Sequence, residues 1–279
     1  MQQLGLEGMP TRLFGCTPSR LTTWSDCPRR YRFTYLDRPP PPKGPAWAHN
    51  TVGAAAHLAL ARWWELPLER RTGPAARALL EQAWQTDGFQ TPQQADRWKG
   101  VTGDSVESYA QHLDPTQDPV GIERTVAFTT EVLTVSGRVD RIDRRGDDLV
   151  IVDYKTGRSA LTQDDARGSL ALALYVLGAR RTLKRDCVRV ELHHLPSGQV
   201  LAWEHTDESL GRHVRRAEAI AAEAVAATAA LADGGDAEDL FPTRTSSLCG
   251  WCDHVRSCPV GLAAAGDAPK KPWSGLAED

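Results

Sequence analysis

The stretch "GRVDRIDRRGDDLVIVDYKTG", residues 137 to 157, carries two aspartates and a lysine on what its residues predict to be two adjoining strands. Gly146 and Asp147 lie between these strands, and a Gly-Asp pair favours a two-residue hairpin turn. Counting outward from that turn sets Asp140 opposite Asp153. Because like charges that face each other across a sheet repel, something must hold the two carboxylates together.

The register of this hairpin decides which side chains meet. In the predicted register Ile142 pairs with Ile151, and Lys155 lies on the same face as Asp153 because side chains alternate along a strand. Two carboxylates and an ammonium group then converge at the end of a strand that is apolar on both faces and therefore central in its sheet. A bulge would shift the register by one residue and send Asp140 to the opposite face.

A divalent cation would explain why the two aspartates lie together. Neighbouring carboxylates either share a proton or bind a cation, and Lys155 alone neutralises half of their charge. Mg²⁺ or Mn²⁺, held by carboxylates with positions left for water and a phosphate oxygen, removes the repulsion. The alternative is two solvated strand-end aspartates with Lys155 as their counter-ion. The convergence of three charged groups on one spot favours the metal site.

Composition and charge limit the classes of protein to consider. The 279 residues have the composition of an ordinary globular protein, and the net charge is -3. Whole-chain charge therefore indicates no nucleic-acid partner, and such a surface would have to be a local patch. The N-terminus lacks a basic start followed by an apolar run, and no stretch approaches about 18 uninterrupted apolar residues. We expect a soluble, cytoplasmic protein with no membrane partner.

Helical and strand-like segments alternate in a way that predicts an α/β fold, with a sheet covered by helices. A Pro-rich linker at residues 37–45 separates a first helix from the rest of the chain. Three antiparallel strands are expected within residues 120–157, and two more within 186–195 and 199–206. Helices are expected at 19–36, from residue 50, within 74–113, and at 163–182 and 208–232.

The charged residues of the hairpin carry a family resemblance. Asp140 followed by Asp153-Tyr154-Lys155 resembles the PD-(D/E)XK nuclease superfamily, and "GRVDRID...VDYKTG" is especially similar to its RecB-like exonuclease branch. Upstream, residues 53–60 fit the G-x-x-x-H-x-x-L helix motif of that branch. The resemblance implies a restriction-endonuclease-like core, a mixed β-sheet flanked by helices, at about residues 50–205 of a single domain, 1–279.

The same resemblance implies roles for individual residues. His57, Asp140, Asp153 and the backbone carbonyl of Tyr154 would hold one or two divalent ions, which activate a water and stabilise charge on the scissile phosphate. Lys155 would orient that water or neutralise the developing oxyanion.

Three further positions bear on the comparison with the family. Glu123 resembles an acidic residue that often precedes the first core strand. Tyr175 matches the tyrosine of a helix motif and is expected at the substrate strand. The family glutamine four residues earlier is replaced by Ala171. This replacement leaves open a catalytically weak or inactive protein.

The cysteines form a second pattern. Cys249, Cys252 and Cys258 lie within ten residues, and Cys27 precedes a proline far upstream, which resembles the iron-sulfur pattern of AddB-like and CRISPR-associated RecB-like nucleases. Structural zinc usually draws on two close pairs of cysteines, whereas this chain has one close pair, a third cysteine further along and a fourth more than two hundred residues upstream. This spacing favours a [4Fe-4S] cluster, and zinc stays the second choice. The cluster would join segments 16–38 and 240–262. Cys16 and Cys187 are expected to be buried.

The resemblance implies a metal-dependent DNA exonuclease that acts on single strands or ends, in recombination, repair or CRISPR adaptation. The alternative is an inactive nuclease fold that binds DNA as the partner of a helicase. Phosphate and base contacts are expected from cations and aromatic side chains on several elements. The candidates are Arg29, Arg30, Arg32, Arg141, Arg158, the run 179–185, Trp63, Trp64 and Trp251. Taken singly, each is better explained as a solvated surface residue or as part of the core.

Overall fold

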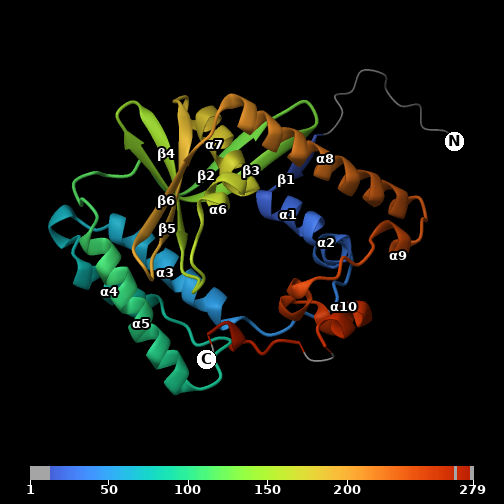
Figure 1. The fold of residues 1–279 in the computed structure, drawn as a ribbon, viewed down its shortest axis with the longest axis horizontal. Coiled ribbons are helices and arrows are strands. Elements are labelled where there is room, and N and C mark those ends of the chain that lie inside the picture. The colour runs from blue at the N-terminus through green and yellow to red at the C-terminus, as the bar shows by residue number, and fades with distance from the viewer. Residues whose placement is uncertain (1–12, 267–268, 277–279) are drawn as a thin grey trace.

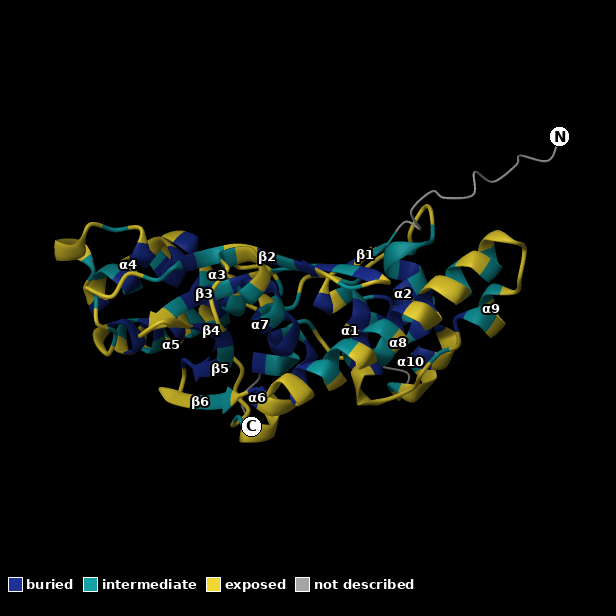
Figure 2. Ribbon diagram, turned by 90° about the horizontal axis from the view of Figure 1, so that it is seen from above, coloured by how far each residue is buried: buried dark blue, intermediate teal, exposed yellow. Residues whose placement is uncertain are grey.

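The computed structural model describes residues 13–266 and 269–276. The outer ends of the predicted domain 1–279, and most of the N-terminal stretch discussed above, lie outside these residues. Seen from above, the molecule is elongated, with α4 and α5 at one end and α8, α9 and α10 at the other (Figure 2). None of the helices in the described part of the chain has the length and apolar character needed to cross a bilayer.

In the described residues a six-stranded mixed sheet forms the centre of the fold (Figure 1). The strand order is β1-β3-β4-β5-β6, and β2 pairs with β3; β1/β3 and β4/β5 are parallel and the other pairs antiparallel. The central place of β4 confirms the prediction from its apolar faces. The strands are Phe14–Cys16 (β1), Gly121–Thr129 (β2), Leu133–Arg145 (β3), Asp148–Lys155 (β4), Cys187–His194 (β5) and Gln199–Glu204 (β6).

The predicted hairpin is confirmed. Ile142 pairs with Ile151, and the two residues between β3 and β4 are Gly146 and Asp147. Gly146 has φ of 65°, a left-handed conformation that glycine adopts without steric cost. The pairing of β3 with β4 ends at Arg141 and Val152, so the ladder stops just before Asp140 and Asp153, and Asp140 lies where the two strands separate.

The long strand β3 has two different neighbours along one edge. Its beginning, Leu133–Val135, pairs with β1, and its end, residues 141–145, pairs with β4. Between them, residues 136–140 have no strand partner on that edge among the described residues, although β2 pairs with the opposite edge. The gap leaves side chains and backbone of β3 open to a pocket.

Helices cover both faces of the sheet, as expected for the predicted α/β layers. Helices α3, α4 and α5 pack on the face of β4 that carries Val150 and Val152, and α7 packs on the face that carries Leu149 and Ile151. The helices are Pro18–Asp26 (α1), Pro28–Tyr35 (α2), Ala48–Trp64 (α3), Gly73–Ala83 (α4), Pro92–Gln111 (α5), Gln163–Gly168 (α6), Leu170–Leu183 (α7), Asp207–Ala232 (α8), Ala237–Leu240 (α9) and Pro259–Ala264 (α10).

Two helices that the sequence predicted as continuous are broken. The segment 19–36 divides at Cys27, whose backbone is extended because the residue before a proline is disfavoured in the helical region. The segment 163–182 divides at Ser169, whose hydroxyl accepts a hydrogen bond from the Leu172 N–H and so begins α7. The short strand β1 was not predicted, since three residues give too weak a pattern.

Two segments far apart in the sequence, α1–α2 and the chain around α9, lie side by side (Figure 1). Trp24 packs edge-on against Phe241, with ring centroids 5.7 Å apart. Arg29 donates to the carbonyl of Phe241 at 3.2 Å, and Arg244 donates to the carbonyl of Ser25 at 2.7 Å. The N- and C-terminal segments therefore join through direct contacts between α1, α2 and the chain around α9.

Close packing between α7 and β2 leads to a stability prediction. A Cβ at Gly178 would lie 2.8 Å from Cγ2 of Val126 and 3.3 Å from the Ala127 nitrogen, so Gly178→Ala should destabilise the fold by about 1–2 kcal/mol after its gain in helix propensity. Gly100 of α5 meets nothing within 4 Å, so Gly100→Ala should stabilise by about 0.5–1 kcal/mol. Urea unfolding measures both, and equal stabilities would contradict this packing.

Candidate active site

A pocket of about 600 Å³ opens at the gap along β3. Its wall combines the beginning of α1, one face of α3, and parts of β2, β3 and α7. These elements come from distant parts of the sequence, and each contributes at least one polar or charged group. The charged and titratable residues in the wall are His57, Glu123, Arg138, Asp140 and Tyr175.

Helix α3 brings His57 against the end of the hairpin. The Nδ1 atom of His57 lies 3.3 Å from Oδ1 of Asp140, and Nε2 lies 3.2 Å from the carbonyl oxygen of Tyr154. One turn earlier, Gly53 approaches Thr156 so closely that a Cβ would lie 3.3 Å from its hydroxyl oxygen. A glycine at this position lets the helix lie close to the end of β4.

The carboxylate of Asp140 occupies the space where β3 and β4 separate. Its Oδ2 accepts a hydrogen bond of 2.9 Å from the backbone N–H of Tyr154, so the side chain replaces a rung of the strand ladder. Asp140 is therefore tied to His57 on one side and to the backbone beside Asp153 on the other. The structure thus brings His57, Asp140 and the backbone of Tyr154 together.

Asp153 and Lys155 form an ion pair at the end of β4. The Nζ atom of Lys155 lies 2.6 Å from Oδ2 of Asp153, as expected for two residues on one face of a strand. The Lys155 side chain is 44% exposed and that of Asp153 is 21% exposed. The ammonium group thus reaches from a largely buried carboxylate toward solvent.

Glu123 is the residue whose place in the site sequence reasoning did not predict. It lies in β2 between two residues that pair with β3, yet its φ is 46°, in the left-handed region that non-glycine residues rarely adopt. Such strain persists where the surrounding structure holds it, often at functional sites. Among the described residues, His57, Glu123 and Asp140 form a group whose ligand atoms all lie within 4.8 Å of one another.

The pKa values show how strongly negative this pocket is. Burial and the Asp140 charge raise the pKa of Glu123, and burial and Asp140 raise that of Asp153 despite the Lys155 ammonium. Burial lowers the pKa of His57, but the three carboxylates outweigh burial and raise it. Without a further cation, the negative charge of Asp140 disfavours the ionised forms of Glu123 and Asp153.

Tyr175 lines the pocket from α7. Its ring lies so close to Gly137 that a Cβ there would be 2.4 Å from Cε1 of the tyrosine. Gly137, the first residue of the quoted stretch, thus makes room for Tyr175 beside the acidic group. Burial, followed by the charges of Asp153 and Asp140, raises the pKa of the Tyr175 hydroxyl.

Comparison with known proteins agrees with this arrangement of strands and acidic residues. A sequence model of the PD-(D/E)XK nuclease superfamily matches residues 16–259. The chain belongs to the PD-(D/E)XK nuclease superfamily. A crystal structure described as "Putative exonuclease" from Eubacterium rectale is 11% identical in sequence, with a TM-score of 0.47, and the match covers 92% of this chain and 94% of that chain. Comparison with curated proteins gives no match.

The sheet and its helices form the restriction-endonuclease-like fold of this superfamily. Nucleases of the superfamily use divalent metals, and oxygen and imidazole ligands suit Mg²⁺ and Mn²⁺. The group of His57, Glu123 and Asp140 has donors of this type at metal-binding distances. The residues of the pocket therefore fit a divalent ion.

Three of the candidate DNA-contacting residues lie in the core instead. Arg141 is 3% exposed, Trp63 is fully buried and Trp64 is 5% exposed, so none of them can reach a phosphate or a base. Trp251 packs against Trp47 with ring centroids 5.2 Å apart. Arg29 and Arg32 are both paired with Glu238 on α9. Arg141, Trp63 and Trp64 therefore stabilise the fold, whereas DNA contacts of Arg29, Arg32 and Trp251 stay predictions.

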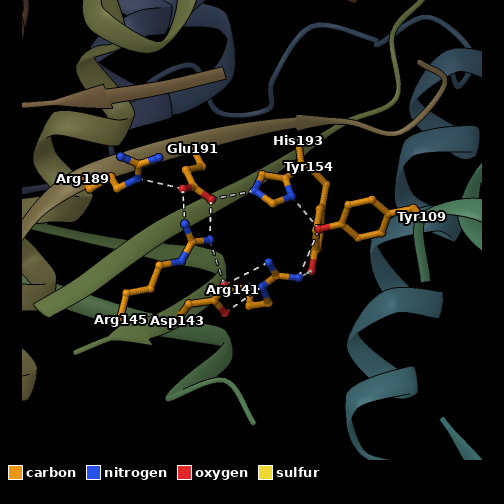
Figure 3. A network of polar contacts seen from close by, with 8 residues as sticks. All are labelled: Tyr109, Arg141, Asp143, Arg145, Tyr154, Arg189, Glu191 and His193. Atoms are coloured by element: carbon orange, nitrogen blue, oxygen red, sulfur yellow. Dashed lines mark hydrogen bonds and ion pairs between the residues drawn. The ribbon is translucent and has the colours of Figure 1, made fainter. Parts of the chain in front are cut away.

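A buried polar network lies behind the candidate active site (Figure 3). Arg141 donates hydrogen bonds of 3.1 Å to the hydroxyls of Tyr109 and Tyr154, and a further bond of 3.0 Å to Asp143. Tyr109 also lies 2.6 Å from Nδ1 of His193. The network fixes the Tyr154 side chain, and so the strand end whose backbone contacts His57 and Asp140.

Glu191 forms the other centre of this network. Its carboxylate is 1% exposed and accepts two hydrogen bonds from Arg145, at 2.7 and 2.8 Å, and one from Arg189 at 2.8 Å; Nε2 of His193 lies 2.9 Å away. Burial by itself raises the pKa of Glu191. The hydrogen bonds from His193, Arg189 and Arg145 outweigh burial, and the resulting pKa is about 2.

The four cysteines of the predicted cluster line one cavity of about 40 Å³. Cys27 lies just before α2, and Cys258 lies just before α10 and accepts a hydrogen bond of 3.3 Å from the Gly261 N–H. A Cβ at Gly261 would lie 3.1 Å from the Cys258 sulfur. Cys16 and Cys187 are buried elsewhere.

The low pKa of Glu191 predicts a pH-dependent stability. Because the folded pKa of about 2 lies below the ordinary 4.5, the ionised Glu191 contributes stability that is complete above pH 4.5 and is lost as the pH falls toward 2. Glu191→Gln should cost about 3 kcal/mol near neutral pH, and its deficit against wild type should shrink below about pH 4.5. Urea unfolding at stepped pH measures this deficit.

The matched control is Glu204→Gln, which removes an exposed partner of Arg189 at 3.1 Å. Its effect on the free energy of unfolding should stay within about 0.5 kcal/mol. A Glu191→Gln deficit that stays constant over this pH range would contradict the ionised state of Glu191.

Proposed function

We propose that this chain is an Mg²⁺- or Mn²⁺-dependent deoxyribonuclease, an exonuclease that hydrolyses phosphodiester bonds of single-stranded DNA or of DNA ends. One observation carries the proposal: His57, Glu123 and Asp140 from three elements line the pocket beside β3, and the charges of Asp153 and Lys155 lie next to them at the end of β4. No structural requirement of the fold explains why so many like charges should meet there. A metal-dependent hydrolysis does explain it.

The residues of the site would have different roles in that reaction. His57, Glu123, Asp140, Asp153 and the carbonyl of Tyr154 would hold the divalent ion or ions, which when bound supply a Lewis acid and lower the pKa of a water. Lys155, whose ammonium group is exposed beside Asp153, is suited to orient that water or to neutralise charge on the phosphate. Tyr175 would contact the substrate strand from α7.

The RecB-like branch, a single domain over residues 1–279, the cytoplasm as the location, and a role in recombination, repair or CRISPR adaptation belong to the same proposal. The branch, the extent of the domain and the pathway rest on the order of the sequence motifs. A helicase partner would supply unwinding, for which the chain has no motif. Polarity and the preference for single or double strands are decided by experiment.

We further propose a [4Fe-4S] cluster at Cys27, Cys249, Cys252 and Cys258. The four thiols share a cavity, and the Gly261 N–H donates to the Cys258 sulfur, the kind of hydrogen bond that tunes such clusters. A single tetrahedral zinc ion at the same four sulfurs stays the second choice.

Degradation of end-labelled DNA tests the nuclease. Anaerobically purified protein should degrade single-stranded or end-bearing DNA with Mg²⁺ or Mn²⁺ and not with EDTA. Asp153→Asn and Glu123→Gln should each weaken Mn²⁺ binding by about tenfold or more, whereas Lys155→Ala should abolish turnover with Mn²⁺ binding retained. Calorimetric titration with Mn²⁺ separates the two kinds of variant.

The control is Arg144→Ala, a charge removed from an exposed residue near the turn of the same hairpin, which should leave activity unchanged. Wild type that binds DNA but cuts neither single- nor double-stranded DNA with either metal would instead identify an inactive, DNA-binding nuclease fold.

Metal analysis tests the cluster. Protein purified without oxygen should contain about four iron atoms and four sulfides per chain, and both should be lost in Cys27→Ser and in Cys258→Ser. Cys16→Ala is the control, because Cys16 is buried against β3 and does not line the cavity. One zinc ion per chain with no sulfide would overturn the cluster in favour of zinc.

A further inference from the structure

An exposed arginine shares the pocket with the candidate metal group. Arg138 lies on β3 two residues before Asp140 and lines the same pocket. Its Nε lies 2.9 Å from Oε2 of Glu123, and its side chain is 70% exposed. Arg138 thus neutralises, from the open side of the pocket, the strained acidic residue whose carboxylate lies beside His57 and Asp140.

The other carboxylates of the site have different partners. Asp153 is paired with Lys155, and Asp140 accepts from the Tyr154 backbone and contacts His57. Glu123 relies on Arg138 as its cationic partner and on a partial charge from His57. A divalent ion that used Glu123 would therefore do so in competition with the Arg138 guanidinium.

Arg138 can leave Glu123 at little cost. An ion pair with one partner 70% exposed contributes little stability, because water solvates the separated guanidinium nearly as well. The side chain stays attached to the segment of β3, residues 136–140, that has no strand partner on the pocket edge in the described chain. A displaced Arg138 therefore remains at the mouth of the pocket.

The mouth of the pocket is where a phosphate would enter. A guanidinium matches a phosphate with two parallel N–H groups, which makes arginine better suited than lysine to this contact. We propose that Arg138 is an exchangeable cation: it neutralises Glu123 in the metal-free protein, and it turns to a phosphate of the DNA strand once Glu123 binds a divalent ion. This inference rests on the proposed nuclease function.

Through this exchange, Arg138 would couple the binding of the metal ion to the binding of DNA. Binding of the ion would release the guanidinium for the substrate, so each ligand would strengthen the binding of the other. A purely structural role, in which Arg138 steadies the left-handed Glu123, predicts something different. Removing Arg138 would then weaken the site for metal and for DNA alike.

Binding measurements on Arg138→Ala separate the two roles without using turnover. Mn²⁺ is titrated calorimetrically into DNA-free protein. Binding of a fluorescent single-stranded oligonucleotide is measured by anisotropy in a Lys155→Ala background, which keeps the DNA intact, with Mn²⁺ and with EDTA. Arg144→Ala is the matched control, since it removes the same charge from an exposed site near the opposite end of β3.

Opposite effects on the two ligands are expected. Arg138→Ala should bind Mn²⁺ several-fold more tightly, because Glu123 loses its competing cation. With Mn²⁺ present it should bind DNA about tenfold more weakly, with a salt dependence reduced by about one phosphate contact. With EDTA its DNA affinity should match that of the Lys155→Ala background alone, and Arg144→Ala should change none of these quantities by more than about twofold.

Weaker or unchanged Mn²⁺ binding in Arg138→Ala would overturn the exchange, as would unchanged DNA affinity with Mn²⁺. Both readouts are independent of cutting. If wild type fails to cut DNA, the proposed function falls while the metal titration still tests Arg138. If wild type cuts and Arg138→Ala behaves as wild type in both titrations, only the exchange fails.

Discussion

Repulsion among the carboxylates of Glu123, Asp140 and Asp153 is the constraint on which the rest of the structure depends. Burial and mutual repulsion raise the pKa of Glu123 and of Asp153, and their field raises the pKa of His57 against the effect of burial. Two cations reduce this repulsion: Lys155 pairs with Asp153, and Arg138 pairs with Glu123. A divalent ion would complete the neutralisation.

The sheet supplies the place for this concentration of charge. Because β1 and β4 share one edge of β3 without meeting, residues 136–140 open onto a pocket instead of a neighbouring strand. Two glycines let the surrounding elements come close. Gly53 brings α3 against Thr156, and Gly137 makes room for Tyr175. The site is thus built from a local defect in strand pairing, with helices packed tightly over both of its sides.

Rigidity comes from the opposite side of the same strands. Arg141 and Glu191, each at most 3% exposed, join β3, β4, β5 and α5 through hydrogen bonds whose donors and acceptors are largely satisfied within the protein (Figure 3). Removing one partner from such a network costs far more than removing a surface ion pair. The Tyr154 side chain is anchored there, so its backbone is held where it contacts His57 and Asp140.

The sequence by itself determined the hairpin, because strand alternation and the Gly-Asp turn are local: the predicted pair Ile142 and Ile151 is found in the sheet. The sequence motifs also predicted His57 as a site residue, and in the structure His57 lies on α3 and lines the pocket. Only the tertiary structure decided that Glu123 lies beside His57 and Asp140, since that depends on a left-handed backbone between two residues that pair with β3. It also decided that Arg141 and Trp63 are buried. Burial sums contacts from segments far apart in the chain, and no local pattern of residues contains that sum.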